Sequence, residues 1–219
     1  MNSYQNKFPV IAIDGTACSG KGTLAKKLSC VLGFDHLDSG ILYRIYAYEF
    51  LKRKIKVDEI EKINVEFFSS KIINSYNLKN LRSENVSKTA SIIAKNKFVR
   101  EQLINVQRNF ADSPPNKKGS VIDGRDITSV IVPNAEVKFY IDASLDIRAR
   151  RRQIQLKLKD ENYEEIYNEM EFRDYSDKNR QNSPLLRTKD SFFIDTSYIL
   201  EKEVLDVALK QIKKKIDFI

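Results

Sequence analysis

The sequence predicts an α/β protein with a five-stranded parallel sheet flanked by helices. Short apolar runs rich in β-branched residues recur along the chain, stretches with helical spacing separate them, and no internal repeat interrupts the alternation. Of the 219 residues, 42% are hydrophobic and 31% are charged, which suffices for one sizeable core. No stretch approaches the roughly 18 apolar residues that a membrane-spanning helix needs.

Each element follows from a local pattern. The predicted strands cover residues 8–13, 34–37, 120–122, 137–141 and 192–194. The predicted helices cover residues 23–32, 41–54, 86–94, 98–110, 145–158, 163–179 and 200–216. Gly33 is expected to end the first helix, and Pro114 and Pro115 predict a loop. Residues 56–100, with a short strand-like piece at 65–68, interrupt the alternation and indicate a lobe inserted into the core.

Charge and cysteine content narrow the class of protein. A net charge of +8 predicts attraction for anions, with nucleotides, nucleic acid and acidic membrane surfaces all open. Cys18 and Cys30 provide no disulfide framework, and the first apolar run, residues 9–13, is too short for a signal peptide. We therefore expect a soluble protein in the reducing cytoplasm.

A phosphate-binding loop is predicted between the first strand and the first helix. Gly15 and Gly20-Lys21 have the spacing at which backbone N–H groups wrap phosphate oxygens, and the helix N-terminus adds positive charge. Lys21 is expected to reach the outer phosphates. Gly22 stands where the general motif has a magnesium-binding hydroxyl, so magnesium near Thr23 and Asp123 is expected to be held through water. For Cys18 we favour a loop-filling role over an oxidisable thiol of lowered pKa.

Further polar clusters lie at predicted strand ends or on helices. They are Asp38-Ser39-Gly40 with Tyr43-Arg44, Asp123-Gly124-Arg125-Asp126, the run Arg148 to Arg152, and Arg173, Asp177 and Arg180 on one helical face. A strand-end Asp is commonly a cap or turn residue, and a charge run is commonly a solvated face. We accept that second interpretation for Arg150. Arg173 and Arg180 flank an aspartate and could grip a phosphate and a hydroxyl together.

In these residues the chain resembles bacterial cytidylate kinases, nucleoside monophosphate kinases of the P-loop class. The matching stretches are 13–23, 37–44, 99–100, 107–108, 123–126, Arg151-Arg152 with Gln155, and 173–180. The resemblance covers nearly the whole chain. It is weak in residues 56–90, and Ser176 and Lys178 stand where the family often has arginine.

The resemblance implies transfer of the γ-phosphoryl group of ATP, with Mg²⁺, to CMP or dCMP. The implied ATP-binding residues are Gly15, Thr16, Ala17, Cys18, Ser19, Gly20, Lys21, Gly22 and Thr23. The implied CMP-binding residues are Ser39, Arg44, Ser91, Arg100, Arg125, Asp126, Arg173, Asp177 and Arg180. Among them Ser91, Arg100 and Asp126 would read cytosine, Arg173 and Asp177 would contact the sugar, and Arg180 would reach phosphate. The implied catalytic residues are Lys21, Arg125, Arg151, Arg152 and Arg180.

The same resemblance implies an organisation in three parts. Residues 1–40, 101–150 and 180–219 would form the P-loop core, 41–100 the monophosphate-binding lobe, and 151–179 a mobile lid with its flanking helices. No histidine base is needed, and His36 is expected to be structural. We expect a monomer that binds neither nucleic acid nor membrane.

Three other functions stay open at this stage. The nearest is another P-loop kinase that acts on UMP or on a non-nucleotide acceptor. A regulatory GTPase would need Asn-Lys-x-Asp, and Asn116-Lys117-Lys118-Gly119 lacks the Asp. A nucleic-acid-binding protein would fit the net charge, but the arginines here alternate with acidic residues instead of forming one basic stripe.

Overall fold

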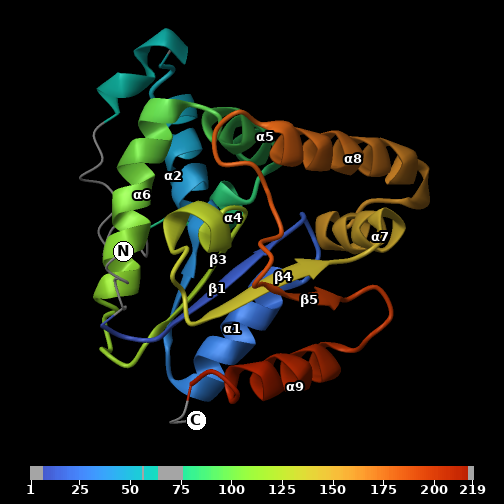
Figure 1. Ribbon diagram of the computed structural model, residues 1–219. Coiled ribbons are helices and arrows are strands. Elements are labelled where there is room, and N and C mark those ends of the chain that lie inside the picture. The colour runs from blue at the N-terminus through green and yellow to red at the C-terminus, as the bar shows by residue number, and fades with distance from the viewer. Residues whose placement is uncertain (1–6, 56, 64–75, 217–219) are drawn as a thin grey trace. The chain divides into compact units, whose positions relative to one another are not determined.

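The computed structural model describes residues 7–55, 57–63 and 76–216 (Figure 1). The chain divides into two compact units. Unit 1 comprises residues 1–37 and 110–219, and unit 2 comprises residues 38–109.

The five-stranded sheet confirms the predicted fold class. Its strands are β1 (Val10–Gly15), β2 (Asp35–Asp38), β3 (Ser120–Gly124), β4 (Val137–Asp142) and β5 (Phe192–Asp195). Their order across the sheet is β2-β3-β1-β4-β5. Ile11 of β1 lies opposite Val121 on one side and Val137 on the other, both in parallel register. β1 and β3 are buried throughout, as their continuous apolar runs predict.

The strand order places β1 where ligands bind in open α/β sheets. After β1 the chain forms β2 and β3 on one side of it, and then crosses to form β4 and β5 on the other side. Segments leaving the carboxyl ends of neighbouring strands therefore diverge at β1, and such a divergence leaves room for a ligand. The loop after β1 begins at this point.

One face of the sheet is covered by α1 (Lys21–Leu32) and α9 (Glu201–Ile212), which pack side by side (Figure 1). Leu28 of α1 and Ala208 of α9 join Ile13 and Phe139 of the sheet in one apolar cluster. Gly33 ends α1 in the left-handed conformation, with φ of 65°, as predicted. The helix predicted at 200–216 ends at Ile212, earlier than its pattern suggested.

A helical pair, α7 (Leu145–Leu156) and α8 (Tyr163–Asn179), packs within unit 1 (Figure 1). α8 has the predicted bounds. α7 stops two residues before its predicted end, because Lys157 adopts the left-handed conformation with φ of 57° and the short helix η4 (Asp160–Asn162) follows. Ala149 of α7 and Ile166 and Met170 of α8 form an apolar cluster with Ala17 from the loop after β1.

Unit 2 contains further helices that the sequence predicts only in part. They are α2 (Ser39–Lys52), η1 (Val57–Lys62), α4 (Leu78–Leu81), α5 (Glu84–Ile93) and α6 (Lys97–Asp112), the last of which runs on into unit 1. α2 packs on α5. η1 and α4 were not predicted, since both are too short to show a period. The strand-like piece expected at 65–68 lies outside the described residues.

A short π-helical turn, η3 (Ile127–Ile131), follows the polar segment after β3 and was also not predicted. Among the described residues, no helix is both long enough and apolar enough to cross a membrane.

Candidate active site

The loop that joins β1 to α1 has a backbone that glycine alone supports at two positions. A side chain at Gly15 would overlap the carbonyl oxygen of Ile141 on β4. Gly20 has φ of 90°, which L-residues with a Cβ rarely adopt. Both glycines of the predicted motif therefore have a structural reason in this backbone. We call residues 15–20 the phosphate loop.

Carbonyl oxygens of the phosphate loop accept hydrogen bonds from side chains. Four consecutive ones accept hydrogen bonds from side chains: Thr16 from Ser19 Oγ (3.0 Å) and Lys21 Nζ (3.2 Å), Ala17 from Arg148 (3.4 Å), Cys18 from Arg151 (3.5 Å), and Ser19 from Thr196 (2.8 Å). These carbonyl oxygens therefore already have hydrogen-bond donors. The loop leads directly into the N-terminus of α1, which favours an anion.

The three consecutive arginines 150–152 of α7 differ in what they contact. Arg151 donates to the carbonyl oxygen of Thr196 at 2.6 Å and to its hydroxyl at 3.0 Å, besides reaching Cys18. Arg152 donates to Gln155 one turn along α7, at 3.1 Å. Arg150 pairs with Asp160 on the surface, at 3.0 Å, in agreement with the solvated-face interpretation. Of the three, Arg151 is therefore the one that contacts the phosphate loop.

Five of the predicted acceptor residues gather within unit 1. We call them the acceptor cluster: Arg125, Asp126, Arg173, Asp177 and Arg180. Arg125 Nε lies 2.9 Å from Asp177 Oδ2, Arg180 Nη1 lies 3.9 Å from Asp177 Oδ1, and Arg180 Nη2 lies 3.5 Å from Asp126 Oδ1. The predicted helical face of residues 173, 177 and 180 is thus joined to the segment after β3.

The acceptor cluster carries more positive than negative charge. Burial alone would raise the pKa of Asp177, but Arg125, Arg173 and Arg180 hold it below its usual value. Burial, followed by repulsion from Arg125, lowers the pKa of Arg173. Three guanidinium groups thus surround two carboxylates. The carboxylates of Asp174 and Asp123 also act on Arg125. Several guanidinium groups gathered in this way offer the paired N–H donors that bind an anion with several oxygens, such as a phosphate.

The other four predicted acceptor residues lie in unit 2. Arg44 on α2 donates to Leu81 O at 3.0 Å and to Ser87 Oγ at 2.5 Å, and Ser91 Oγ donates to Ser87 O at 3.3 Å. Ser87 therefore links Arg44 to Ser91. Sequence reasoning missed it, and the available signal was a small polar residue on the otherwise apolar face of α5.

Arg100 and Ser39 in the same unit are both buried, with 3% and 4% of their surface exposed. Arg100 donates to Ala94 O at 3.2 Å and lies over the ring of Tyr43. Ser39 is the first residue of α2. The structure brings Arg44 and Ser91 together through Ser87, and it places the acceptor cluster in the other unit.

Asp123, at the end of β3, is a suitable carboxylate for a nucleotide-bound magnesium ion. Its Oδ2 lies 3.6 Å from the point that a Cβ added to Gly22, in the first turn of α1, would occupy, and its Oδ1 lies 2.8 Å from His36 Nε2. Thr23 is exposed. No group of three or more ligating side chains occurs in the part of the chain that the structure describes. These residues therefore fit a magnesium ion whose other ligands are nucleotide and water.

Asp14 is a site residue that sequence reasoning missed. It is fully buried on β1 and accepts hydrogen bonds from Ile127 N (2.9 Å), Thr128 N (2.8 Å) and Thr128 Oγ1 (2.7 Å). Burial raises its pKa to about 6, against the lowering effect of these hydrogen bonds. Asp14 thus fixes the π-helical turn that directly follows Asp126.

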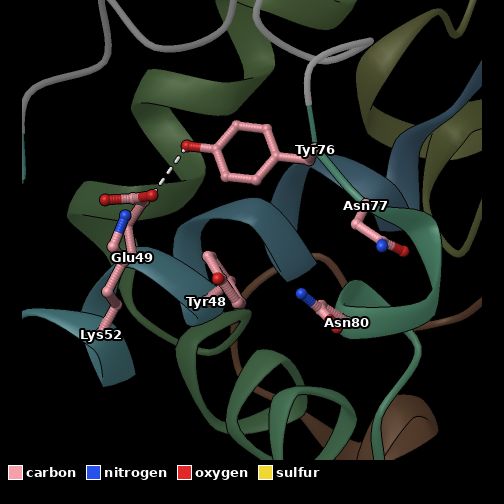
Figure 2. Close-up of a pocket in the computed structure, with 6 residues that line it drawn as sticks. All are labelled: Tyr48, Glu49, Lys52, Tyr76, Asn77 and Asn80. Atoms are coloured by element: carbon pink, nitrogen blue, oxygen red, sulfur yellow. Dashed lines mark hydrogen bonds between the residues drawn. The ribbon is translucent and has the colours of Figure 1, made fainter.

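A separate pocket of about 420 Å³ lies in unit 2 (Figure 2). Its lining consists of Tyr48, Glu49, Lys52, Tyr76, Asn77 and Asn80, none of which is a predicted site residue. Glu49 already accepts from the Tyr76 hydroxyl at 2.9 Å and from Arg53 at 3.1 Å. We assign no substrate to this pocket.

Comparison with known proteins agrees with this geometry. The cytidylate kinase family model matches residues 11–214. A cytidylate kinase from Bartonella tribocorum is 43% identical over 86% of each chain, and one from Bartonella henselae is 41% identical over 91% of this chain and 92% of its own. A gluconokinase structure from Sinorhizobium meliloti shares the fold at a TM-score of 0.52 and 9% identity, covering 96% of this chain and 94% of its own. The sequence match spans both units, and the chain belongs to the cytidylate kinase family.

Proposed function

We propose that this protein transfers the γ-phosphoryl group of ATP to CMP or dCMP, giving ADP and CDP or dCDP. The observation that carries the proposal is the pairing, within unit 1, of a phosphate loop with a cluster of three arginines around Asp177. Family membership supports the same reaction. A kinase that joins two polyanions needs a donor cradle and a positively charged acceptor site, and both features are present.

On the donor side, the phosphate loop and the N-terminus of α1 hold the phosphates of ATP. Lys21 and Arg151, whose side chains lie against the loop, neutralise charge on the transferring group. Asp123 would hold a magnesium ion through water, and that ion would supply further neutralisation of the phosphates. The bond that forms joins an oxygen of the acceptor phosphate to the γ-phosphorus, the bond to the β-phosphate oxygen breaks, and ADP leaves with that electron pair.

On the acceptor side, positioning is the main task of the protein. Arg125 and Arg180 bind the phosphate, together with Arg44 and Ser39 of unit 2. Arg173 and Asp177 hold the sugar. Residues 41–100, which lie within unit 2, are the monophosphate-binding lobe in this proposal, and residues 151–179 form the lid whose closure excludes water.

Cytosine recognition falls to Ser91, Arg100 and Asp126. Cytosine presents a donor at N4 beside acceptors at N3 and O2, so a carboxylate and donor groups on the protein complement it. Ser87 supports this arrangement, because its hydroxyl accepts from Arg44 and its carbonyl accepts from Ser91. Uracil presents the opposite pattern at the 4-position and would leave a buried protein group unsatisfied.

A panel of acceptors tests the proposal. ADP formation is measured with CMP, dCMP, UMP, AMP and shikimate at matched concentrations. We expect CMP or dCMP to be preferred over UMP by about tenfold or more, the worth of one mismatched buried hydrogen bond. The variant Arg100→Met should lower the CMP:UMP ratio, whereas Arg82→Met, an exposed arginine of unit 2, should leave it unchanged. If UMP or shikimate is preferred, this proposal is wrong and the protein is another P-loop small-molecule kinase.

The expected monomer and the expected cytoplasmic location remain predictions. Light scattering during size-exclusion chromatography tests the first, and fractionation of cells that produce the protein tests the second.

A further inference from the structure

Arg148 is a charged side chain in the interior of unit 1. Only 5% of its surface is exposed. A buried charge is costly unless partners compensate for it, so its contacts should reveal why it is there. It lies on α7, in the arginine run that includes the surface residue Arg150.

On one side, Arg148 contacts the phosphate loop. Its Nη1 donates to Ala17 O at 3.4 Å, and its Nε donates to Ala143 O at 2.8 Å. The same Nε lies 3.7 Å from Asp142 Oδ1, the carboxylate oxygen that accepts the hydroxyl of Thr16 at 2.5 Å. One guanidinium group therefore supports two consecutive loop residues, Ala17 directly and Thr16 through Asp142.

On the other side, Arg148 holds α8. Its Nη2 lies 2.6 Å from Asp174 Oδ2, and Asp174 is itself 7% exposed. The other oxygen of Asp174, Oδ1, is buried and has no hydrogen-bond partner in the described part of the chain. The ion pair of Asp174 in the described part of the chain is thus the one with Arg148, and its charge also acts on Arg125. Asp174 directly follows Arg173 and precedes Asp177 by three residues.

Apolar contacts also join the phosphate loop to α8. Ala17 packs with Ile166 and Met170 of α8 in one cluster. The phosphate loop and α8 are thus joined twice, through side-chain packing and through the ion pair. A shift of the loop on binding a nucleotide would be transmitted to the helix that carries the sugar-binding side chains.

We propose that Arg148 is a positioning residue that couples nucleotide binding at the phosphate loop to the orientation of α8. The identity of the two substrates rests on the proposed function. The coupling itself rests on the contacts of Arg148 and needs only a nucleotide at the loop. It predicts that a change at Asp174, on α8, alters ATP affinity through Arg148.

A double-mutant cycle tests this coupling. The affinity for ATP with Mg²⁺, without any acceptor, is measured by titration calorimetry for the wild type, Asp174→Asn, Arg148→Met and the double variant. We expect Asp174→Asn to weaken ATP binding about five- to tenfold, in the range of coupling within one polar network. In the Arg148→Met background the same change should have less than about a twofold effect. Arg150→Met, Asp160→Asn and their double variant form the matched control, because that ion pair is exposed and its arginine lies on α7, as Arg148 does.

The outcomes separate coupling from simple stability. If Asp174→Asn lowers the melting temperature but leaves ATP affinity within twofold of wild type, the proposal is overturned and the pair is only structural. Equal effects of Asp174→Asn with and without Arg148 also overturn it, since the coupling would then bypass Arg148. If Arg148→Met does not fold, Arg148→Lys takes its place in the cycle. If CMP is not phosphorylated, the proposed function is refuted. The double-mutant cycle can still be interpreted, because its titrations contain no acceptor.

Discussion

Replacing Asp177 with alanine should damage both the acceptor cluster and catalysis. Asp177 is the carboxylate that Arg125 approaches to 2.9 Å and Arg180 to 3.9 Å, and only 14% of its side chain is exposed. Its removal leaves guanidinium groups close together without their shared counter-charge. Breaking a buried pair costs about 3–5 kcal/mol, and the partial exposure here favours the lower end. At about 2–4 °C per kcal/mol for a chain of this size, the melting temperature should fall by roughly 6–12 °C.

The kinetic effect follows from the sugar contact assigned to Asp177. A hydrogen bond to a charged group contributes about 1.5–3 kcal/mol, so kcat/KM for CMP should fall about ten- to a hundredfold. If only the 2′-hydroxyl is held, dCMP should be nearly indifferent to the change. If the 3′-hydroxyl or the orientation of Arg173 also matters, dCMP turnover should fall too.

Steady-state kinetics with varied CMP and dCMP, well below the melting temperature, measure this effect. The matched control is Asp160→Ala, which removes an Arg–Asp contact of 3.0 Å whose aspartate side chain is 92% exposed. That change should cost less than about 1 kcal/mol and leave the kinetics unaltered. An Asp177→Ala enzyme whose kcat/KM for both acceptors stays within threefold of wild type would refute the sugar-binding role.

Three further predictions concern the donor loop, base choice and pH. Lys21→Met should lower the rate of phosphoryl transfer about a hundredfold or more, with an unchanged melting temperature. Lys26→Met, at an exposed position of the same helix, should leave the transfer rate unchanged. If Lys21→Met were as fast as the wild type, the phosphate loop would not be the donor site. Asp126→Ala should lower the CMP:UMP ratio of kcat/KM about tenfold, and an equal loss for both acceptors would exclude base reading. Asp14 has a pKa raised by burial to about 6 in the folded protein, so the folded state holds its proton more tightly than the unfolded state. Denaturant titrations give the free energy of unfolding of the wild type and of Asp14→Asn. The difference in favour of the wild type should grow by about 2–3 kcal/mol as the pH falls from about 7 to about 4. A difference that does not change with pH would contradict this.

Strong periodic patterns predicted most of the fold. The five apolar runs became the five strands, and the pattern of residues 163–179 became α8 with the same bounds. The turn η3 and the helix η1 were missed because a few residues cannot display a period. The observed end of β1 also differs from the predicted one. Gly15 completes the strand through its close approach to Ile141, and the sequence does not reveal this contact.

Candidate site residues could be predicted where the residue type and its spacing indicate a particular chemistry. Lysine after a glycine loop and arginine at helical spacing are such signals, and unit 1 gathers Arg125, Arg173 and Arg180 as expected. Arg148 could not be separated from Arg150 by sequence, since both belong to one charged run. Burial on α7, with 5% of Arg148 exposed against a half-exposed Arg150 side chain, is what distinguishes them.

Transfer of a radiolabelled γ-phosphate tests the central claim most directly. Labelled ATP is incubated with the protein and CMP, and the products are separated by chromatography. The account predicts label in CDP, dependent on CMP, and lost in Lys21→Met. Label that appears as inorganic phosphate at the same rate with and without CMP would contradict it, because the bound nucleotide would then be hydrolysed and no acceptor site would be at work.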